Sequence, residues 1–222
     1  MKGGKSNSEI VIDSLCDLAL AKGADKAVAI QASDVVIDER VRMKCLVPTC
    51  SFYGNNLLCP PNLMAVEEFR KIVDQYSTAV LIRLPSSSKP VPPEISGVIS
   101  LNDLWRKIDP RKNSRKKDIN PAIDYFGDLK ASQEKLYKII ESMEAGSLAA
   151  GHRFATGFAA GGCLLCDRCV GPKSNEPCRH PFRARPSMEA MGIDVVGTAE
   201  KAGLQVDFSD DQPHWFGLVL IE

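Results

Sequence analysis

The sequence lacks both an excess of charge and a long hydrophobic run. Its 222 residues include 28 Lys and Arg against 28 Asp and Glu, so the formal net charge is zero. A neutral chain has no overall field that attracts nucleic acid or an anionic membrane. No uncharged apolar stretch approaches the roughly 18 residues that a membrane-spanning helix requires. We therefore expect a soluble protein that binds neither nucleic acid nor a membrane.

The N-terminal segment also lacks the features of a secretory signal. Its apolar run over residues 10–20 is interrupted by Asp13 and Asp17, which a signal peptide does not tolerate in its core. The expected location is the cytoplasm, where thiol pools keep cysteines reduced. Clustered cysteines in that compartment more often bind metal than form structural disulfides.

Familiar catalytic motifs are missing as well. The chain contains no Walker-type phosphate loop, no G-x-G-x-x-G after a strand and no G-x-S-x-G elbow. These absences argue against nucleotide-driven chemistry and against a serine hydrolase. No catalytic residue is assigned from the sequence.

Apolar spacing predicts helices that alternate with short strands. The expected fold is a single α/β or α+β domain over residues 1–222, with a mixed sheet, flanking helices and two cysteine-rich metal loops. Val41, Met43 and Cys45 continue an alternation, so the first cysteine loop is expected to leave a strand. The predicted strands cover 27–31, 35–37, 78–84, 154–160, 204–208 and 216–221. The predicted helices begin at Ser8, at Asn62, at Pro121 with a break near Gly127, near Ser187 and near Asp194.

Two irregular stretches lie between the predicted elements. Residues 85–96 contain four prolines and three consecutive serines, which is typical of a loop. Residues 103–118 carry seven lysines and arginines interspersed with aspartates. A basic stretch of this kind is suited to docking an acidic redox protein partner, although a solvated surface is the simpler interpretation.

The sequence contains eight cysteines, and seven of them are clustered in two groups. Cys16 stands alone among apolar residues and is expected in the core. More than 100 cysteine-free residues separate the two groups of the other seven. The candidate metal ligands are Cys45, Cys50 and Cys59 in the first group, and Cys163, Cys166, Cys169 and Cys178 in the second.

The spacing of the second group, C-x2-C-x2-C-x8-C, favours one or two [4Fe–4S] clusters as the cofactor. Two ligand schemes remain open. In one, the second group completes a cluster by itself and the first group holds another with one iron that lacks a thiolate. In the other, Cys59, which precedes a proline, exchanges places with Cys178. Zinc is the alternative metal, since thiolates also select it.

These patterns support three functional hypotheses. The first is a redox or electron-transfer accessory protein. The second is an enzyme in which an open iron performs Lewis-acid or sulfur-transfer chemistry, with Tyr53 as a candidate proton donor. The third is a structural zinc protein, in which a histidine completes the three-cysteine group. The candidates for that histidine are His152, His180 and His214.

Cations are concentrated around the second cysteine group. They offset the negative charge of a thiolate-bound cluster, or bind a phosphate or carboxylate ligand. The alternative is that they pair with acidic scaffold residues such as Glu189, which is expected to complement a helix N-terminus. The basic residues in question are Arg168, Lys173, Arg179, His180, Arg183 and Arg185.

Three blocks of the sequence carry a family resemblance. They are C-x4-C-x2-Y-G-x4-C-P-P from Cys45, G-x-C-x2-C-x2-C from Gly161, and C-R-x-P-x2-A-R-P-S-M-E-A-x-G-I-D-V from Cys178. This pattern resembles the cysteine-rich "predicted metal-binding protein" family, a domain of unknown function, from about residue 9 to the C-terminus. The resemblance implies metal binding and assigns no reaction or substrate.

Overall fold

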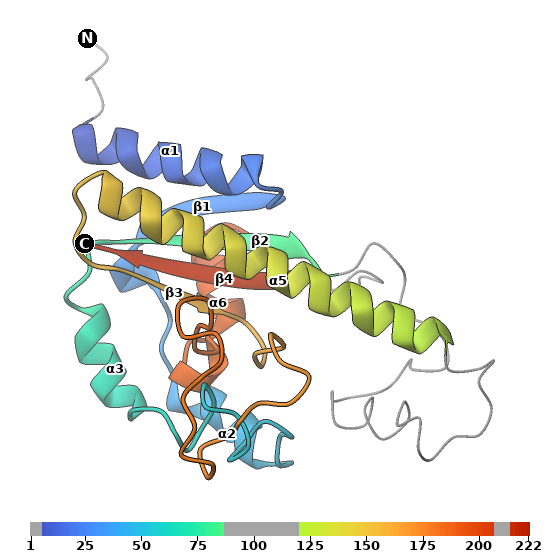
Figure 1. Ribbon diagram of the computed structural model, residues 1–222. Coiled ribbons are helices and arrows are strands. Elements are labelled where there is room, and N and C mark those ends of the chain that lie inside the picture. The colour runs from blue at the N-terminus through green and yellow to red at the C-terminus, as the bar shows by residue number, and fades with distance from the viewer. Residues whose placement is uncertain (1–5, 87–119, 207–213) are drawn as a thin grey trace.

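The computed structural model describes residues 6–86, 120–206 and 214–222, and its centre is a four-stranded sheet (Figure 1). The strands are β1 (Lys26–Gln31), β2 (Thr78–Pro85), β3 (Ala155–Ala159) and β4 (His214–Ile221), in the spatial order β1-β2-β4-β3. The predicted loop beyond residue 86 and the basic stretch 103–118 lie outside the described residues.

The α/β or α+β prediction is confirmed, but the expected mixed sheet is not. All three strand ladders among the described residues are antiparallel. The one parallel pairing there is an isolated bridge between Ala159 and Ser187. Alternation of helices and strands does not fix the direction in which each strand enters the sheet, and the antiparallel ladders make this an α+β fold. The boundary of the domain at residues 1–222 stays a prediction.

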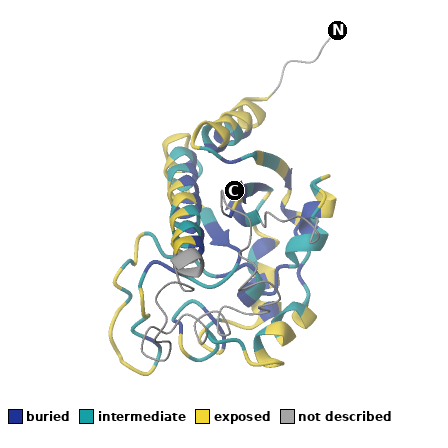
Figure 2. Ribbon diagram, turned by 90° about the vertical axis from the view of Figure 1, so that its right-hand side faces the viewer, coloured by how far each residue is buried: buried dark blue, intermediate teal, exposed yellow. Residues whose placement is uncertain are grey.

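Helices cover both faces of the sheet. One face packs against α1 (Asn7–Ala21) and the long α5 (Asn120–Ala149), and the other against α3 (Val66–Val73) and α6 (Val195–Lys201). Buried residues therefore gather on the strands and on the helix surfaces that face them (Figure 2). The central strands β2 and β4 read as nearly continuous apolar runs because both of their faces are covered.

Several predicted helices are confirmed with altered ends. Ser6, not Ser8, caps α1, because Ser6 and Glu9 form a reciprocal capping box. Helix α3 begins at Val66, several residues after the predicted cap at Asn62. Helix α5 runs through Gly127 without a break. Near Ser187 the chain forms only a 3-10 turn, η3 (Glu189–Met191).

The strands predicted at 35–37, 41–45 and 204–208 are wrong for the described residues. Residues 35–37 form only one bridge, between Ile37 and Ile193. Residues 204–206 form no strand, and 207–208 lie outside the description. Residues 41–45 belong to a helix, α2 (Glu39–Leu46), which the Asp38 carboxylate caps by accepting from the Arg40 N–H at 2.8 Å. The first cysteine loop therefore leaves the end of a helix, not a strand edge.

Candidate metal centre

The second cysteine group follows β3 through a glycine turn. Gly161 has φ +77°, a conformation that favours glycine. Gln133 of α5 then fixes the chain on both sides of Cys163. Its Nε2 donates to the Gly162 carbonyl at 2.9 Å, and its Oε1 accepts from the Leu164 N–H at 2.9 Å. Because Gln133 is 1% exposed, these bonds hold the start of the loop rigidly against α5.

The four thiols of the second group surround one small cavity. Its lining combines those thiols with residues of both loops, namely Asn56, Leu57, Leu58, Cys163, Leu165, Cys166, Cys169, Cys178, His180 and Ala184. The His180 N–H donates to Cys178 Sγ at 3.4 Å. All eight cysteines of the chain are free thiols. Soft donors and apolar side chains thus share one enclosed space.

The first cysteine group forms a compact loop by successive turns. The Cys50 N–H donates to the Cys45 carbonyl at 3.0 Å, and the Tyr53 N–H donates to the Cys50 carbonyl at 3.0 Å. Cys59 is only 6% exposed. Burial, followed by the nearby thiols of Cys50, Cys45 and Cys163 and the Glu189 carboxylate, raises the pKa of Cys59. Burial also raises the pKa of Cys45.

Direct contacts join the two loops. Asn56 Nδ2 donates to the Cys163 carbonyl at 3.4 Å, while Asn56 Oδ1 accepts from the Leu58 N–H at 2.9 Å. The Phe52 ring lies so close to Gly162 that a Cβ there would be 2.6 Å from Phe52 Cδ2. The structure therefore brings together cysteines that are more than 100 residues apart in sequence, and Cys163 is near enough to contribute to the raised pKa of Cys59.

Tyr137 of α5 lies beside Cys163. Its hydroxyl is buried and has no hydrogen-bond partner of ordinary geometry among the described residues, and burial raises its pKa well above the usual value. Burial raises the pKa of the Cys163 thiol, whereas interactions with the Leu165 backbone and the Tyr137 hydroxyl lower it. The two side chains are near enough for the hydroxyl to donate to a thiolate at Cys163.

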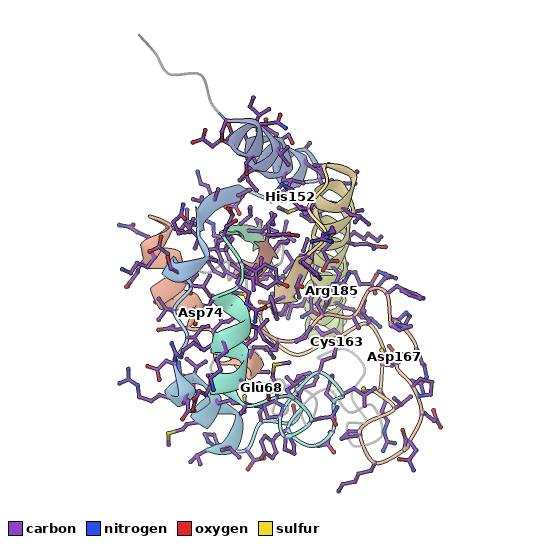
Figure 3. The ribbon with its side chains drawn as sticks, turned by 90° about the vertical axis from the view of Figure 1, so that its left-hand side faces the viewer. Glu68, Asp74, His152, Cys163, Asp167 and Arg185 are labelled. Atoms are coloured by element: carbon purple, nitrogen blue, oxygen red, sulfur yellow. The ribbon has the colours of Figure 1, made fainter. Side chains whose placement is uncertain are left out.

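An ion pair anchors the end of the second loop on α5. Arg185 Nε lies 3.0 Å and 3.1 Å from the two carboxylate oxygens of Glu144, and both side chains are less than 20% exposed. Glu144 Oε1 also accepts from the Gly157 N–H of β3 at 2.8 Å. Figure 3 shows Arg185 near α5, between Cys163 and the helix end where His152 lies. Arg185 therefore has a scaffold role, but its partner is Glu144 and not Glu176, Glu189 or Asp194, the acidic residues expected from the sequence.

The other candidate residues fall in different places. His180 lines the second-group cavity, His152 Nδ1 lies 3.0 Å from the Glu222 carbonyl, and His214 lies 4.0 Å from Asp25. Among the described residues no histidine forms a hydrogen bond or ion pair with the first group. The Glu189 carboxylate accepts from the Gly161 N–H at 3.0 Å and from Ser187 Oγ at 2.7 Å. It thus ties the glycine turn to η3, besides acting on the pKa of Cys59.

No group of three or more His, Cys, Asp or Glu side chains within the described ranges is arranged tightly enough to hold a single metal ion. A tetrahedral zinc site with Zn–S bonds of about 2.3 Å needs sulfurs about 3.8 Å apart. Each iron corner of a cubane takes its own thiolate, so its ligands are spread more widely. Four thiols around a shared cavity fit that donor set.

Comparison with known proteins adds a family and no individual relative. In the part of the chain that the structure describes, no helix is both long and apolar enough to cross a membrane. No curated protein and no solved structure shows significant similarity to the chain. The family described as "Predicted metal-binding protein (DUF2284)" matches residues 28–221, a span that contains all seven clustered cysteines. The chain belongs to this predicted metal-binding family.

Proposed function

We propose that this protein binds iron–sulfur clusters and serves as a redox or electron-transfer accessory protein. Cys163, Cys166, Cys169 and Cys178 would hold one [4Fe–4S] cluster. Cys45, Cys50 and Cys59 would hold a second centre beside it. A bound cluster supplies reversible one-electron transfer. The observation that carries the proposal is the single cavity lined by the four thiols of the second group.

The protein's own groups support this assignment around the sulfurs. The His180 N–H points at Cys178 Sγ, and backbone N–H donors of this kind stabilise anionic sulfur ligands. Leu57, Leu58 and Leu165 line the same cavity and make part of its wall apolar. An apolar surrounding and N–H donors are two of the factors that set the potential of a cluster.

The cavity also favours one of the two ligand schemes. Cys178 lines it together with Cys163, Cys166 and Cys169, whereas Cys59 does not. The second group therefore completes a set of four by itself, and the first group keeps three thiols. Among the described residues no histidine is bonded to the first group, so a cluster held there would have one iron without a protein ligand. That open iron is the basis for the alternative function, which is Lewis-acid or sulfur-transfer catalysis.

Metal and acid-labile sulfide analysis of anaerobically purified protein tests the proposal. We expect about four or eight irons per chain with matching sulfide, and absorbance near roughly 400 nm that dithionite bleaches. Cys169→Ser should remove about four irons. Cys16→Ser is the matched control and should remove none, because Cys16 packs against the core. Colourless protein that contains zinc and no sulfide would overturn the proposal in favour of a structural zinc protein.

A further inference from the structure

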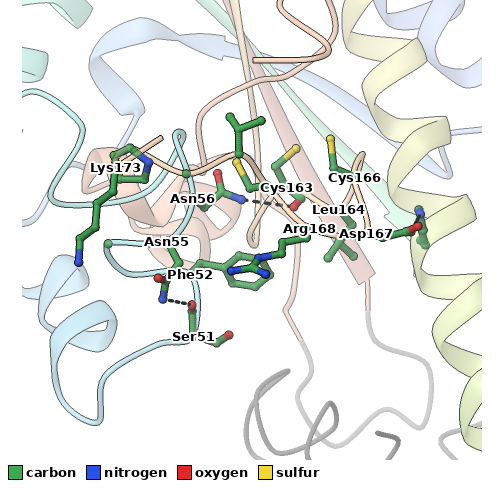
Figure 4. Close-up of a pocket in the computed structure, with 16 residues that line it drawn as sticks. Ser51, Phe52, Asn55, Asn56, Cys163, Leu164, Cys166, Asp167, Arg168 and Lys173 are labelled. Atoms are coloured by element: carbon green, nitrogen blue, oxygen red, sulfur yellow. Dashed lines mark hydrogen bonds and ion pairs between the residues drawn. The ribbon is translucent and has the colours of Figure 1, made fainter. Parts of the chain in front are cut away.

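A pocket of about 410 Å³ lies between the two cysteine loops, outside the cavity that the four thiols share. One wall is residues 51–56 of the first loop, and the other is residues 163–173 of the second (Figure 4). Cys163, Cys166 and Cys169 border it. Pockets of roughly 300–1,000 Å³ are the size of small-molecule sites.

The polar lining of this pocket is predominantly basic. The lining contains three basic side chains, those of Lys130, Arg168 and Lys173, and one carboxylate, that of Asp167. Asp167 is already paired with Lys130 at 2.7 Å. The side chains of Arg168 and Lys173 have no ion-pair or hydrogen-bond partner in the described part of the chain. Two uncompensated cations therefore remain available to a ligand.

The pocket walls include an aromatic ring, and contacts between the two loops fix the positions of the walls. Phe52 lines the pocket and packs on Gly162. A Cβ at Gly171 would lie 3.2 Å from the Asn55 carbonyl oxygen, so the two loops also meet closely at this second point. The Asn55 side chain is held by donation to the Ser51 carbonyl at 3.0 Å. The pocket is thus preformed by contacts between the loops.

We propose that this pocket binds a small molecule that carries a carboxylate or phosphate group. Arg168 and Lys173 would bind the oxyanion, since a guanidinium pairs with two oxygens of such a group at once. Phe52 would contact the remainder of the ligand. The inference rests on the proposed function, because it assumes that the neighbouring thiols bind metal. It adds the chemical class of the small molecule that would bind beside that metal centre.

Fluorine NMR on anaerobically purified, metal-loaded protein tests this site. The probes are 4-fluorobenzoate, fluorophosphate and the neutral isostere 4-fluorobenzamide. We expect one or both anions to bind and the amide to bind at least about tenfold more weakly. Preference between the two anions identifies the ligand as a carboxylate or a phosphate.

Paired variants separate a specific site from general charge effects. The double variant Arg168→Gln/Lys173→Gln should weaken anion binding by about tenfold or more. Arg153→Gln/Lys71→Gln makes the same change in net charge away from the pocket and should leave binding unchanged. All four side chains lie on exposed residues, so these variants are expected to fold.

Three outcomes would overturn the inference. They are absence of anion binding to the unsubstituted protein, equal binding of the neutral isostere, and equal losses in the two double variants. If the unsubstituted protein binds no anion and the pocket variant has a shifted visible spectrum, the two cations only offset cluster charge. Iron and sulfide are measured in every sample. Iron without anion binding refutes the pocket alone, whereas anion binding to protein with zinc and no sulfide refutes the proposed function alone.

Discussion

At the residue scale, the candidate centre depends on two polar side chains in the apolar face of α5. Gln133 and Tyr137 are each 1% exposed and reach the chain at Cys163 from neighbouring turns of the helix. The sequence contains a signal for Gln133, since an amide interrupts an apolar series that includes Leu129, Leu136 and Ile140. A buried amide needs partners, and these are the backbone groups of Gly162 and Leu164 in the second cysteine loop.

Tyr137→Phe should raise the pKa of the Cys163 thiol in the metal-free protein. The tyrosine hydroxyl lowers this pKa by interaction with the sulfur, and phenylalanine cannot donate. The free energy of unfolding should change by less than about 1 kcal/mol, because the lost hydroxyl has no well-formed hydrogen bond. The pH dependence of Cys163 alkylation, followed by mass spectrometry, measures the shift. An unchanged midpoint would contradict the assigned contact.

Cys16 offers a pH-dependent prediction away from the metal loops. Burial, and then Asp13 and Asp17, raises its pKa to about 11. Alkylation by iodoacetamide should therefore be slow at pH 8 and accelerate about tenfold per pH unit toward pH 11. In the unfolded chain the Cys16 thiol ionises near about pH 8.5. The contribution of Cys16 to stability is thus complete below pH 8.5 and lost as the pH rises to 11.

The urea-unfolded chain is the control for this measurement. Its Cys16 peptide should be alkylated with a midpoint near about pH 8.5. If the folded protein gave the same midpoint, Cys16 would not be packed against the core.

At the scale of elements, the sequence predicts the buried strands and long helices well and the short elements poorly. Residues 78–84 and 216–221 are strands because their apolar runs are covered on both faces. The alternation of Val41, Met43 and Cys45 led to a wrong strand prediction. Helix α2 buries none of its residues, so its apolar residues need not follow the spacing of a helix with one buried face. The informative signal there was local, since Asp38 is a helix cap.

The clustering of the cysteines could be predicted from the sequence, whereas the contacts between their loops could not. Spacing along the chain marks Cys163, Cys166 and Cys169 as neighbours, and resemblance to the family extends this to metal binding. Which loop faces which depends on Gln133, Asn56 and the Phe52 contact at Gly162, all of them tertiary interactions. No local pattern encodes such contacts.

Gly162→Ala should weaken the contact between the two cysteine loops. The added Cβ would lie 2.6–2.8 Å from three carbons of the Phe52 ring, so the ring has to move. We expect a loss of about 1–3 kcal/mol in the free energy of unfolding, together with a lower metal content. Chemical denaturation and metal analysis measure the two effects.

Gly127→Ala is the matched control for this substitution. It is an exposed residue within α5, with no atom outside the adjacent helix backbone within 4 Å of the new Cβ. Alanine there should stabilise the protein by up to about 1 kcal/mol without changing metal content. A Gly162→Ala protein as stable and as metal-rich as the original would show that Phe52 does not join the loops.

At the scale of the whole molecule, the sheet and the two cysteine loops are stabilised by different means. Two apolar layers cover the sheet, and residues such as Leu81, Ile82 and Leu218 are fully buried there. The loops over 45–61 and 161–186 contribute little to those layers and contain no helix longer than the last turn of α2. Their order depends on a few polar contacts and, in the proposed function, on metal–sulfur bonds.

Removal of metal should therefore disorder the two loops beyond the segment that Gln133 holds on α5, and leave the sheet intact. Anaerobic chelation, followed by hydrogen exchange, should abolish protection of amides in 45–61 and 166–186, while those of β2 and β4 and the Leu164 amide, which Gln133 binds beside Cys163, stay protected. The two loops should lose protection together, because Asn56 and Phe52 of one contact Cys163 and Gly162 of the other. Loss of protection in only one loop would show that the centres are independent. Equal loss in β2 and β4 would instead mean that the apolar layers cannot fold without metal, as in small zinc domains.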